Sequence, residues 1–215
     1  MIRSSIPLMA AFAAVGSVLF GAGSAMAMPI DNSGLNCTFK FNVNGSMPFL
    51  AFSNGKTATN LASSNYFTAD TDSSGNMSFD GSSMSAVPTN AFLGANNIYV
   101  RLQFTDVQGT TDLSGALPNI NWVMTAKAQF VDAADGISTV NCQTSTFTIN
   151  VSGNWGNTTS TAFTIPSLSG SGSGACNTHA AGVSSALGLG SSGATLTLYK
   201  FSAFNGTTGL ALHGS

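Results

Sequence analysis

The chain has 215 residues, of which 43% are hydrophobic and only 7% are charged, and its formal net charge at pH 7 is −2. Soluble domains usually carry about 25% charged residues, so Ser, Thr, Asn and Gly must provide most of the polar surface here. The six Lys and Arg residues form no basic stripe, which excludes nucleic acid as a partner. All eight acidic residues are Asp, and the lack of Glu excludes the HExxH zinc site.

The first segment has the pattern of an export signal. Arg3 precedes an almost unbroken apolar run over residues 6–20, and Ala25-Met26-Ala27 matches the small-x-small site of a signal peptidase. The run is shorter than the ~20 residues that span a bilayer. We therefore expect a signal peptide over 1–27, no stable membrane span, and a single domain over 28–215. This mature protein would be secreted, extracellular or held in the cell envelope.

The mature part reads mainly as short strands. Apolar and polar residues alternate with a period of two over 35–41, 98–104 and 120–130. Between Val140 and Val151 the alternation changes phase, which predicts a bulge or a strand break near Thr144-Ser145. Weaker strands are expected at 49–52, 66–69, 77–79, 162–165 and 195–201. Turn pairs such as Asn54-Gly55 separate them. We predict an all-β, antiparallel β-sandwich, Ig-like or jelly-roll-like.

One stretch departs from the strand pattern. Residues 167–190 form a Gly/Ser-rich excursion, and within it Val183, Ala186 and Leu187 have helical spacing. Asn177 or Thr178 could cap the start of a helix and Gly188 its end. This predicts a short helix across one end of the sandwich.

Three cysteines remain after the signal is removed. Cys37, Cys142 and Cys176 would all reach an oxidising compartment, where disulfides persist, but three cannot all pair within one chain. Cys37 and Cys142 both fall on apparent inward positions of strands, so one reading joins these two and leaves Cys176 spare. The other reading joins Cys142 to Cys176 and staples the helical excursion to the sheet. A third reading keeps all three as free thiols.

Two short motifs resemble a known group of proteins. Leu35-Asn36-Cys37-Thr38-Phe39, and Ala134-Asp135-Gly136 followed by Val140-Asn141-Cys142-Gln143, are similar to secreted actinobacterial β-sandwich domains of unknown function. The resemblance implies a Cys37–Cys142 disulfide and a cell-envelope location, and it implies no activity. The chain departs from that family by adding Cys176 and the 167–189 excursion.

A run of oxygen-bearing side chains forms a calcium candidate. Asp70, Asp72, Ser74 and Asn76 alternate, and Gly75 follows at the sixth position, which is the spacing of an EF-hand-like loop. Position 12 is Gly81 instead of the bidentate Glu. The alternative is a hairpin turn stabilised by its own Asp and Asn side chains. Apart from this calcium candidate, no cofactor is expected.

Two tryptophans and two aspartates are the remaining candidates for a functional site. Trp155 lies in a polar turn and is a candidate for stacking on a ligand, although it could instead cover the end of the sandwich. Trp122 belongs to an alternating apolar set and is expected in the core. Asp132 and Asp135 flank a turn, where Asp is common, and they do not define the opposed carboxylates of a glycosidase. We predict no catalytic residue and no enzyme.

The leading functional hypothesis is a secreted or cell-envelope structural or adhesive protein. Its expected partners are further copies of itself or other cell-surface proteins, because low net charge does not oppose association. The first alternative is an extracellular ligand-binding module of carbohydrate type that uses Trp155. A further alternative, an outer-membrane β-barrel, lacks evident aromatic girdles.

Overall fold

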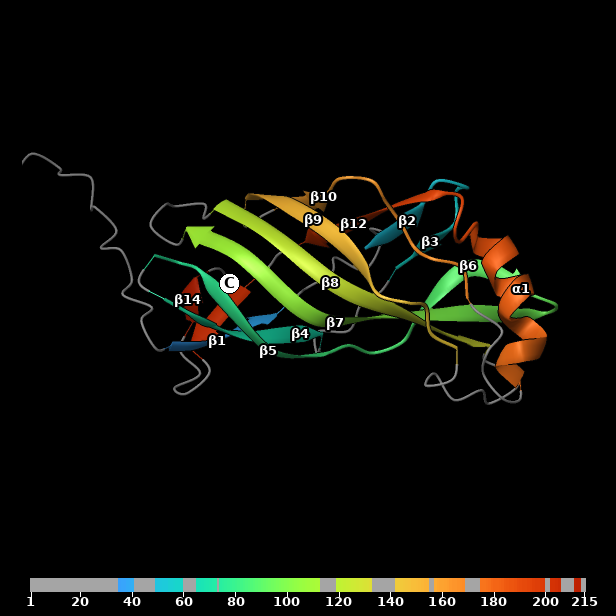
Figure 1. The fold of residues 1–215 in the computed structure, drawn as a ribbon, viewed down its shortest axis with the longest axis horizontal. Helices are drawn as coiled ribbons and strands as arrows, with labels where there is room; N and C mark the ends of the chain where they lie inside the picture. The colour runs from blue at the N-terminus through green and yellow to red at the C-terminus, as the bar shows by residue number, and fades with distance from the viewer. Residues whose placement is uncertain are drawn as a thin grey trace, which may run out of the picture.

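The structure is a computed structural model that describes residues 35–40, 49–59, 65–72, 74–112, 119–132, 142–154, 157–168, 175–199, 202–205 and 211–213. The described strands and the helix are arranged as Figure 1 shows. They are β1 (Leu35–Lys40), β2 (Leu50–Phe52), β3 (Thr57–Ala58), β4 (Tyr66–Thr71), β5 (Met77–Ser83), β6 (Val87–Leu93), β7 (Asn96–Asp112), β8 (Asn119–Asp132), β9 (Phe147–Asn154), β10 (Asn157–Ser160), β11 (Phe163–Thr164), α1 (Ala175–Leu187), β12 (Gly193–Tyr199), β13 (Ser202–Asn205) and β14 (Ala211–His213).

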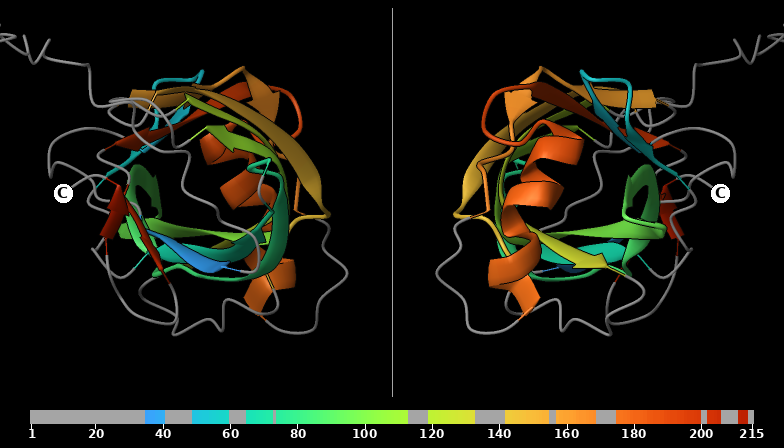
Figure 2. Two further views of the ribbon diagram at one scale, coloured as in Figure 1. Left: turned by 90° about the vertical axis from the view of Figure 1, so that its left-hand side faces the viewer. Right: turned by 90° about the vertical axis from the view of Figure 1, so that its right-hand side faces the viewer.

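The larger sheet is antiparallel and closes on itself. Its nine strands follow the order β10-β9-β8-β7-β6-β3-β2-β12-β11. β10 also pairs with β12, from Asn157 opposite Tyr199 to Thr159 opposite Thr197, so the order returns to its first strand. The views along the long axis show the strands curling round a common interior (Figure 2). Closure gives β10 a partner on both edges, whereas β11 pairs only with β12 among the described strands; unpaired edges are where sheets aggregate.

The long strands β7 and β8 form the backbone of this sheet. They pair from Ile98 opposite Asp132 to Asp112 opposite Asn119, with one register shift between Phe104 and Asp106. On both strands the apolar residues of the alternating sets are buried, which confirms the faces that the period of two predicted. The shift adds one residue to β7, so the strand keeps its apolar side inward on both sides of the bulge.

The smaller sheet packs against one end of the larger one. Its order is β14-β13-β1-β4-β5, and all of its pairings are antiparallel. Phe67 of β4 is fully buried, and its ring centroid lies 5.2 Å from that of Trp122 in an edge-on contact. A second edge contact joins Phe67 to Phe104 at 6.4 Å. Edge-to-face aromatic pairs add stability beyond area burial. The predicted all-β, antiparallel fold class with one short helix is thus confirmed, and the larger sheet differs from a plain sandwich layer because it closes on itself.

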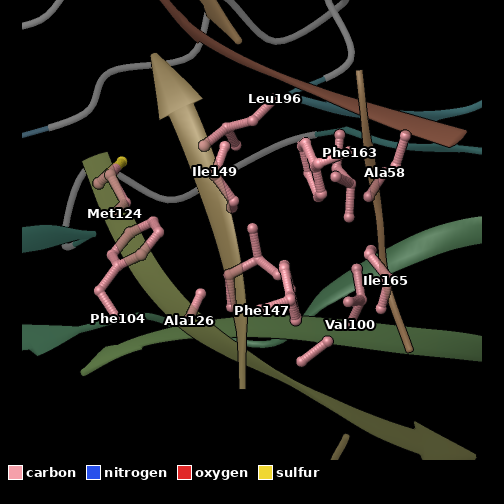
Figure 3. Close-up of a cluster of buried hydrophobic side chains, with 14 of the residues drawn as sticks. Ala58, Val100, Phe104, Met124, Ala126, Phe147, Ile149, Phe163, Ile165 and Leu196 are labelled. Atoms are coloured by element: carbon pink, nitrogen blue, oxygen red, sulfur yellow. The ribbon is translucent and has the colours of Figure 1, made fainter. Parts of the chain in front are cut away.

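Apolar side chains fill the interior of the closed sheet. Figure 3 shows residues of β3, β7, β8, β9, β11 and β12 pointing toward one another. Phe147 and Phe163 are stacked there, with ring centroids 5.7 Å apart and an interplanar angle of 11°. Ile149 and Leu196 are fully buried beside them. Side chains from strands far apart in the chain therefore share one core.

The predicted phase change before β9 is confirmed. Gln143 forms an isolated bridge with Gln129, and Thr144 donates its backbone N–H to the Ala128 carbonyl oxygen at 2.9 Å. Residues 145 and 146 then leave β8, and β9 begins at Phe147. The chain thus approaches β8 twice, in two different phases, which is what the slip in apolar parity indicated.

The helix α1 occurs where the sequence predicted it, and it begins slightly earlier. It lies across one end of the closed sheet, near β6 (Figure 1). Gly182 in its middle faces Leu93, whose Cδ1 lies 2.7 Å from where a glycine-to-alanine change would place a Cβ. The helix ends at Leu187, and Gly188 follows with a φ of 67°, the left-handed conformation that terminates many helices.

Candidate functional site

The turn between β4 and β5 is held together by one carboxylate. Asp72 Oδ1 accepts hydrogen bonds from the backbone N–H groups of Ser74 and Asn76, each at 2.9 Å. Asp72 Oδ2 accepts a third from the Asn76 side-chain amide at 2.8 Å. These bonds, first the one from the Asn76 side chain, lower the pKa of Asp72, because each favours the charged form.

This geometry matches the hairpin alternative for the calcium candidate. Asp72 and Asn76 do come together, as hydrogen-bond partners of each other. Asp70 and Ser74 are exposed on either side of them. Within the described residues no group of three or more His, Cys, Asp or Glu side chains is placed to hold a metal ion. Calcium binding stays a prediction, and the arrangement favours a turn stabilised by its own side chains.

A second carboxylate on the same strand pair has the opposite shift. The pKa of Asp80 is raised, first by partial burial of the carboxyl group and then by the negative charge of Asp70. The register of β4 and β5 shifts between Thr68 and Ala69, so Phe79 and Gly81 face consecutive β4 residues and Asp80 lies at the irregularity. Asp80 at this bulge is thus close enough to Asp70 for the two charges to interact.

A hollow of about 370 Å³ lies between β5 and β7, and the sequence analysis missed it. It is lined by Asn76, Met77, Ser78, Phe79, Asp106, Gln108, Gly109 and Thr110. Gln108 donates its side-chain amide to Asp106 Oδ2 at 2.8 Å. A second hollow of about 280 Å³ shares Asn76, Met77 and Ser78 and is otherwise lined by Asp70, Thr71 and Asp72. The first residue of β5 and its neighbours therefore line two adjacent depressions.

Further along the same seam lies a polar network. The guanidinium of Arg101 donates to Gln129 Oε1, through Nε at 2.7 Å and also through a terminal nitrogen. Gln129 is 5% exposed, and its side-chain amide in turn donates a hydrogen bond to Gln103 Oε1 at 3.0 Å. Arg101 and Gln103 also line a smaller hollow of about 160 Å³ opposite Ser82. The network satisfies a buried amide whose desolvation would otherwise be costly.

The outward face of β8 and β9 carries a row of short, uncharged side chains. Three cross-strand pairs make up this face, which we call the β8–β9 face: Asn121 opposite Ser152, Val123 opposite Asn150, and Thr125 opposite Thr148. Val123 is 44% exposed, one of two large hydrophobic side chains that the described residues leave exposed; the other is Phe92. The face combines hydrogen-bonding groups with an apolar centre.

Cys142 is disulfide-bonded and 3% exposed. The side chains of Cys37 and Cys176 lie outside the described residues, so the choice of partner stays a prediction. The backbone carbonyl oxygen of Cys142 accepts a hydrogen bond from the Phe130 N–H at 2.9 Å. Cys142 therefore lies beside the C-terminal part of β8.

Of the remaining candidate residues, the structure describes the side chain of one, Trp122. Trp122 is fully buried, as predicted for a core residue. Trp155 and Asp135 lie outside the described residues, and so does the side chain of Asp132 at the end of β8. The structure thus leaves the predicted ligand role of Trp155 a prediction.

No family model, curated protein or solved structure matches this chain. Within the described ranges, no helix has both the length and the apolar character needed to cross a membrane. The proposed function is therefore inferred from the geometry of the described residues.

Proposed function

We propose that the chain is an exported, non-enzymatic protein of the cell surface or envelope that acts by contact between surfaces, as a structural or adhesive element. The observation that carries this proposal is the β8–β9 face, where Asn, Ser and Thr lie around Val123 on these two strands. On the β7 side, Gln108 is opposite Val123 and Asp106 is opposite Thr125. Short polar side chains lose little rotamer entropy on contact. These side chains can also replace their hydrogen bonds to water by hydrogen bonds to a partner. Because they are uncharged, this replacement avoids the large free-energy cost of desolvating an ion.

Export is supported by the oxidised state of Cys142. Disulfides persist in secreted and envelope proteins and are rare in the bacterial cytosol, and Cys142 is disulfide-bonded. The apolar leader over 6–20 and the Ala25-Met26-Ala27 site predict the same destination.

The strand register favours Cys176 as the partner of Cys142. Cys37 of β1 is opposite Ala69 of β4, two residues from Phe67, whose ring packs on Trp122. Cys142 is beside Phe130, eight residues further along β8, which is about 26 Å of strand. A disulfide needs Cα atoms within about 7 Å of each other. The helix that begins at Ala175 lies at the Phe130 end of the sheet (Figure 1), so we infer a Cys142–Cys176 staple there.

The contact proposal is tested by inserting one charge into the β8–β9 face. The mature protein over 28–215 is followed by sedimentation velocity at increasing concentration, together with Val123→Lys and the matched control Ala181→Lys, which adds the same charge on the exposed side of α1. We expect oligomers for the parent and the control and monomers for Val123→Lys. A parent that stays monomeric at every concentration, or a Val123→Lys protein that assembles like the parent, would contradict self-association through this face.

A second function, binding of a carbohydrate-type ligand, is favoured by the hollow between β5 and β7. Its lining combines an aromatic ring with amide, hydroxyl and carboxylate groups, and it does not depend on Trp155.

A further inference from the structure

We propose that the hollow between β5 and β7 binds one ring of a neutral carbohydrate. The proposal concerns a site on the seam between the two sheets. It rests on the second function proposed above and does not require self-association. Gln108 and Asp106 of the hollow are opposite Val123 and Thr125 of the β8–β9 face, so the two sites are neighbours, and ligand binding and assembly are measured separately.

The hollow is closed at both ends by direct contacts between its two strands. At one end Asn76 and Thr110 form an isolated bridge, and Thr111 donates its N–H to the Gly75 carbonyl oxygen at 3.0 Å. At the other end the Ser82 hydroxyl donates to the Phe104 carbonyl oxygen at 3.2 Å. Between these contacts the described parts of β5 and β7 share no strand pairing. The strands are thus held apart at a fixed spacing, which makes a preformed site.

Two glycines keep the closed end and the floor of the hollow in place. Gly75 has a φ of 78°, and a Cβ there would lie 2.4 Å from the Thr111 carbonyl oxygen. Gly109, which lines the hollow, has a φ of 130°, and its Cβ would lie 2.1 Å from the Asn121 carbonyl oxygen. Only glycine tolerates both the backbone angle and the close approach. Gly109 therefore lets β7 lie close against β8 behind the hollow.

The lining has the chemistry of a polyol site. Phe79 lines the hollow, and its ring is backed by Phe67, with centroids 6.4 Å apart. The C–H face of a sugar ring can pack on such an aromatic side chain. Asp106 and Gln108 are already linked by one hydrogen bond, so their planar groups are held for a ligand. The amide of Asn76 adds both a donor and an acceptor, and sugar hydroxyls require both.

Size and charge narrow the class of ligand. About 370 Å³ is at the lower end of the range for small-molecule pockets, which suits a single ring better than a long chain. No Lys, Arg or His is among the lining residues, so nothing there would attract a phosphate or sulfate. Asp106 in the hollow and Asp70 and Asp72 beside it would repel a uronic acid. An extended peptide would need a strand edge that is open at its ends, and here both ends are closed.

The test is a nuclear magnetic resonance titration of the ¹⁵N-labelled mature protein. The probes are glucose, galactose, mannose, arabinose and N-acetylglucosamine, with glucuronate as the charged comparison. We expect at least one neutral sugar to shift the side-chain amide signals of Asn76 and Gln108 in a saturable way, while Asn150 on the β8–β9 face stays unchanged. Glucuronate should bind more weakly than its neutral counterpart glucose.

Two exposed substitutions make the test specific. Gln108→Ala should weaken binding about five- to tenfold, the loss expected for one hydrogen bond between neutral groups. Thr148→Ala, also exposed but on β9, should leave the affinity unchanged. Equal affinity in Gln108→Ala and the parent would overturn the proposal. So would a series in which no neutral sugar shifts Asn76 or Gln108 at tens of millimolar, or in which glucuronate binds best.

Discussion

The indole Nε1 of Trp122 donates a hydrogen bond to the Thr111 hydroxyl oxygen at 2.8 Å, with both residues buried. The same hydroxyl donates onward to the sulfur of Met77 at 3.3 Å. Because Trp122 is on β8, Thr111 on β7 and Met77 on β5, one threonine links the closed sheet to the smaller sheet. Buried polar groups that lose their partner are costly, so this link should contribute to stability.

Thr111→Val is therefore expected to destabilise the protein although it preserves the shape of the side chain. The indole N–H would lose this acceptor, which costs about 1–3 kcal/mol. Thr110→Val, the exposed neighbour on the same strand, should change the free energy of unfolding by no more than about 0.5 kcal/mol. Urea unfolding followed by tryptophan fluorescence measures both. Equal stabilities for the two variants would show that the Trp122–Thr111 bond contributes nothing.

Gly109→Ala and Gly55→Ala compare two causes of lost stability: collision of the new Cβ with a neighbouring strand, and strain from a positive φ. Both glycines have a positive φ, 130° at Gly109 and 83° at Gly55. A Cβ at Gly109 would collide with the Asn121 carbonyl oxygen, whereas a Cβ at Gly55 would meet nothing within 4 Å. We expect Gly55→Ala to cost about 1 kcal/mol from strain alone, and Gly109→Ala to cost clearly more, since β7 must move away from β8. Thermal unfolding compares them, and a larger loss at Gly55 would contradict this packing.

The two shifted carboxylates predict opposite dependences on pH. The folded-state pKa of Asp72 lies below the ordinary 3.8, so its contribution to stability is present above that value and is lost as the pH falls through the folded pKa. Asp72→Asn should therefore lower the unfolding midpoint at neutral pH and have little effect in strong acid.

Asp80 provides the matched comparison on the same hairpin. Its folded-state pKa is raised, so the folded state disfavours the charged carboxylate at neutral pH, and this penalty disappears as the pH falls and the group is protonated. Asp80→Asn should raise the midpoint at neutral pH. Unfolding midpoints from neutral to acidic pH test both, and parallel curves for the two variants would contradict the assigned shifts.

Removing single cysteines should have unequal effects. A Cys142–Cys176 bridge closes a loop of about 35 residues, which is worth about 3–4 kcal/mol in the chain-entropy model. Cys142→Ser and Cys176→Ser should both lose about this much stability, and Cys37→Ser should leave the bridge intact. Alkylation of thiols before reduction reports the bridge directly. If Cys37→Ser makes Cys142 reactive toward the alkylating reagent, Cys37 is the partner.

The elements that the sequence predicted best are those whose patterns are local. The alternation over 120–130, the helical spacing of Val183 and Leu187 and the change of phase before Phe147 each depend on neighbouring residues, and the structure confirms each. β6 was missed because its inward positions include the small Ala91 and the polar Thr89, and because Pro88 weakens a strand reading.

The rest depends on contacts between residues that are far apart in the chain. The pairing of Thr158 with Leu198, which closes the larger sheet, has no local signal. The hollow between β5 and β7 joins Asn76 and Phe79 to Asp106 and Gln108, and these become neighbours only once two sheets have formed. The spacing in the sequence did identify Asp72 and Asn76 as candidate site residues, although the same residues suit a metal-binding loop and a hairpin turn equally well. Only their hydrogen bonds distinguish the two.

The central claim is that this chain works outside the cytosol as an oxidised surface protein. The most direct measurement is intact mass with non-reducing peptide mapping of the protein recovered from outside its producing cells. The account predicts a chain that begins at Met28, is two hydrogens lighter than its reduced form, and yields one linked peptide pair containing Cys142 and Cys176. A full-length chain found only inside the cells with three alkylatable thiols would contradict it.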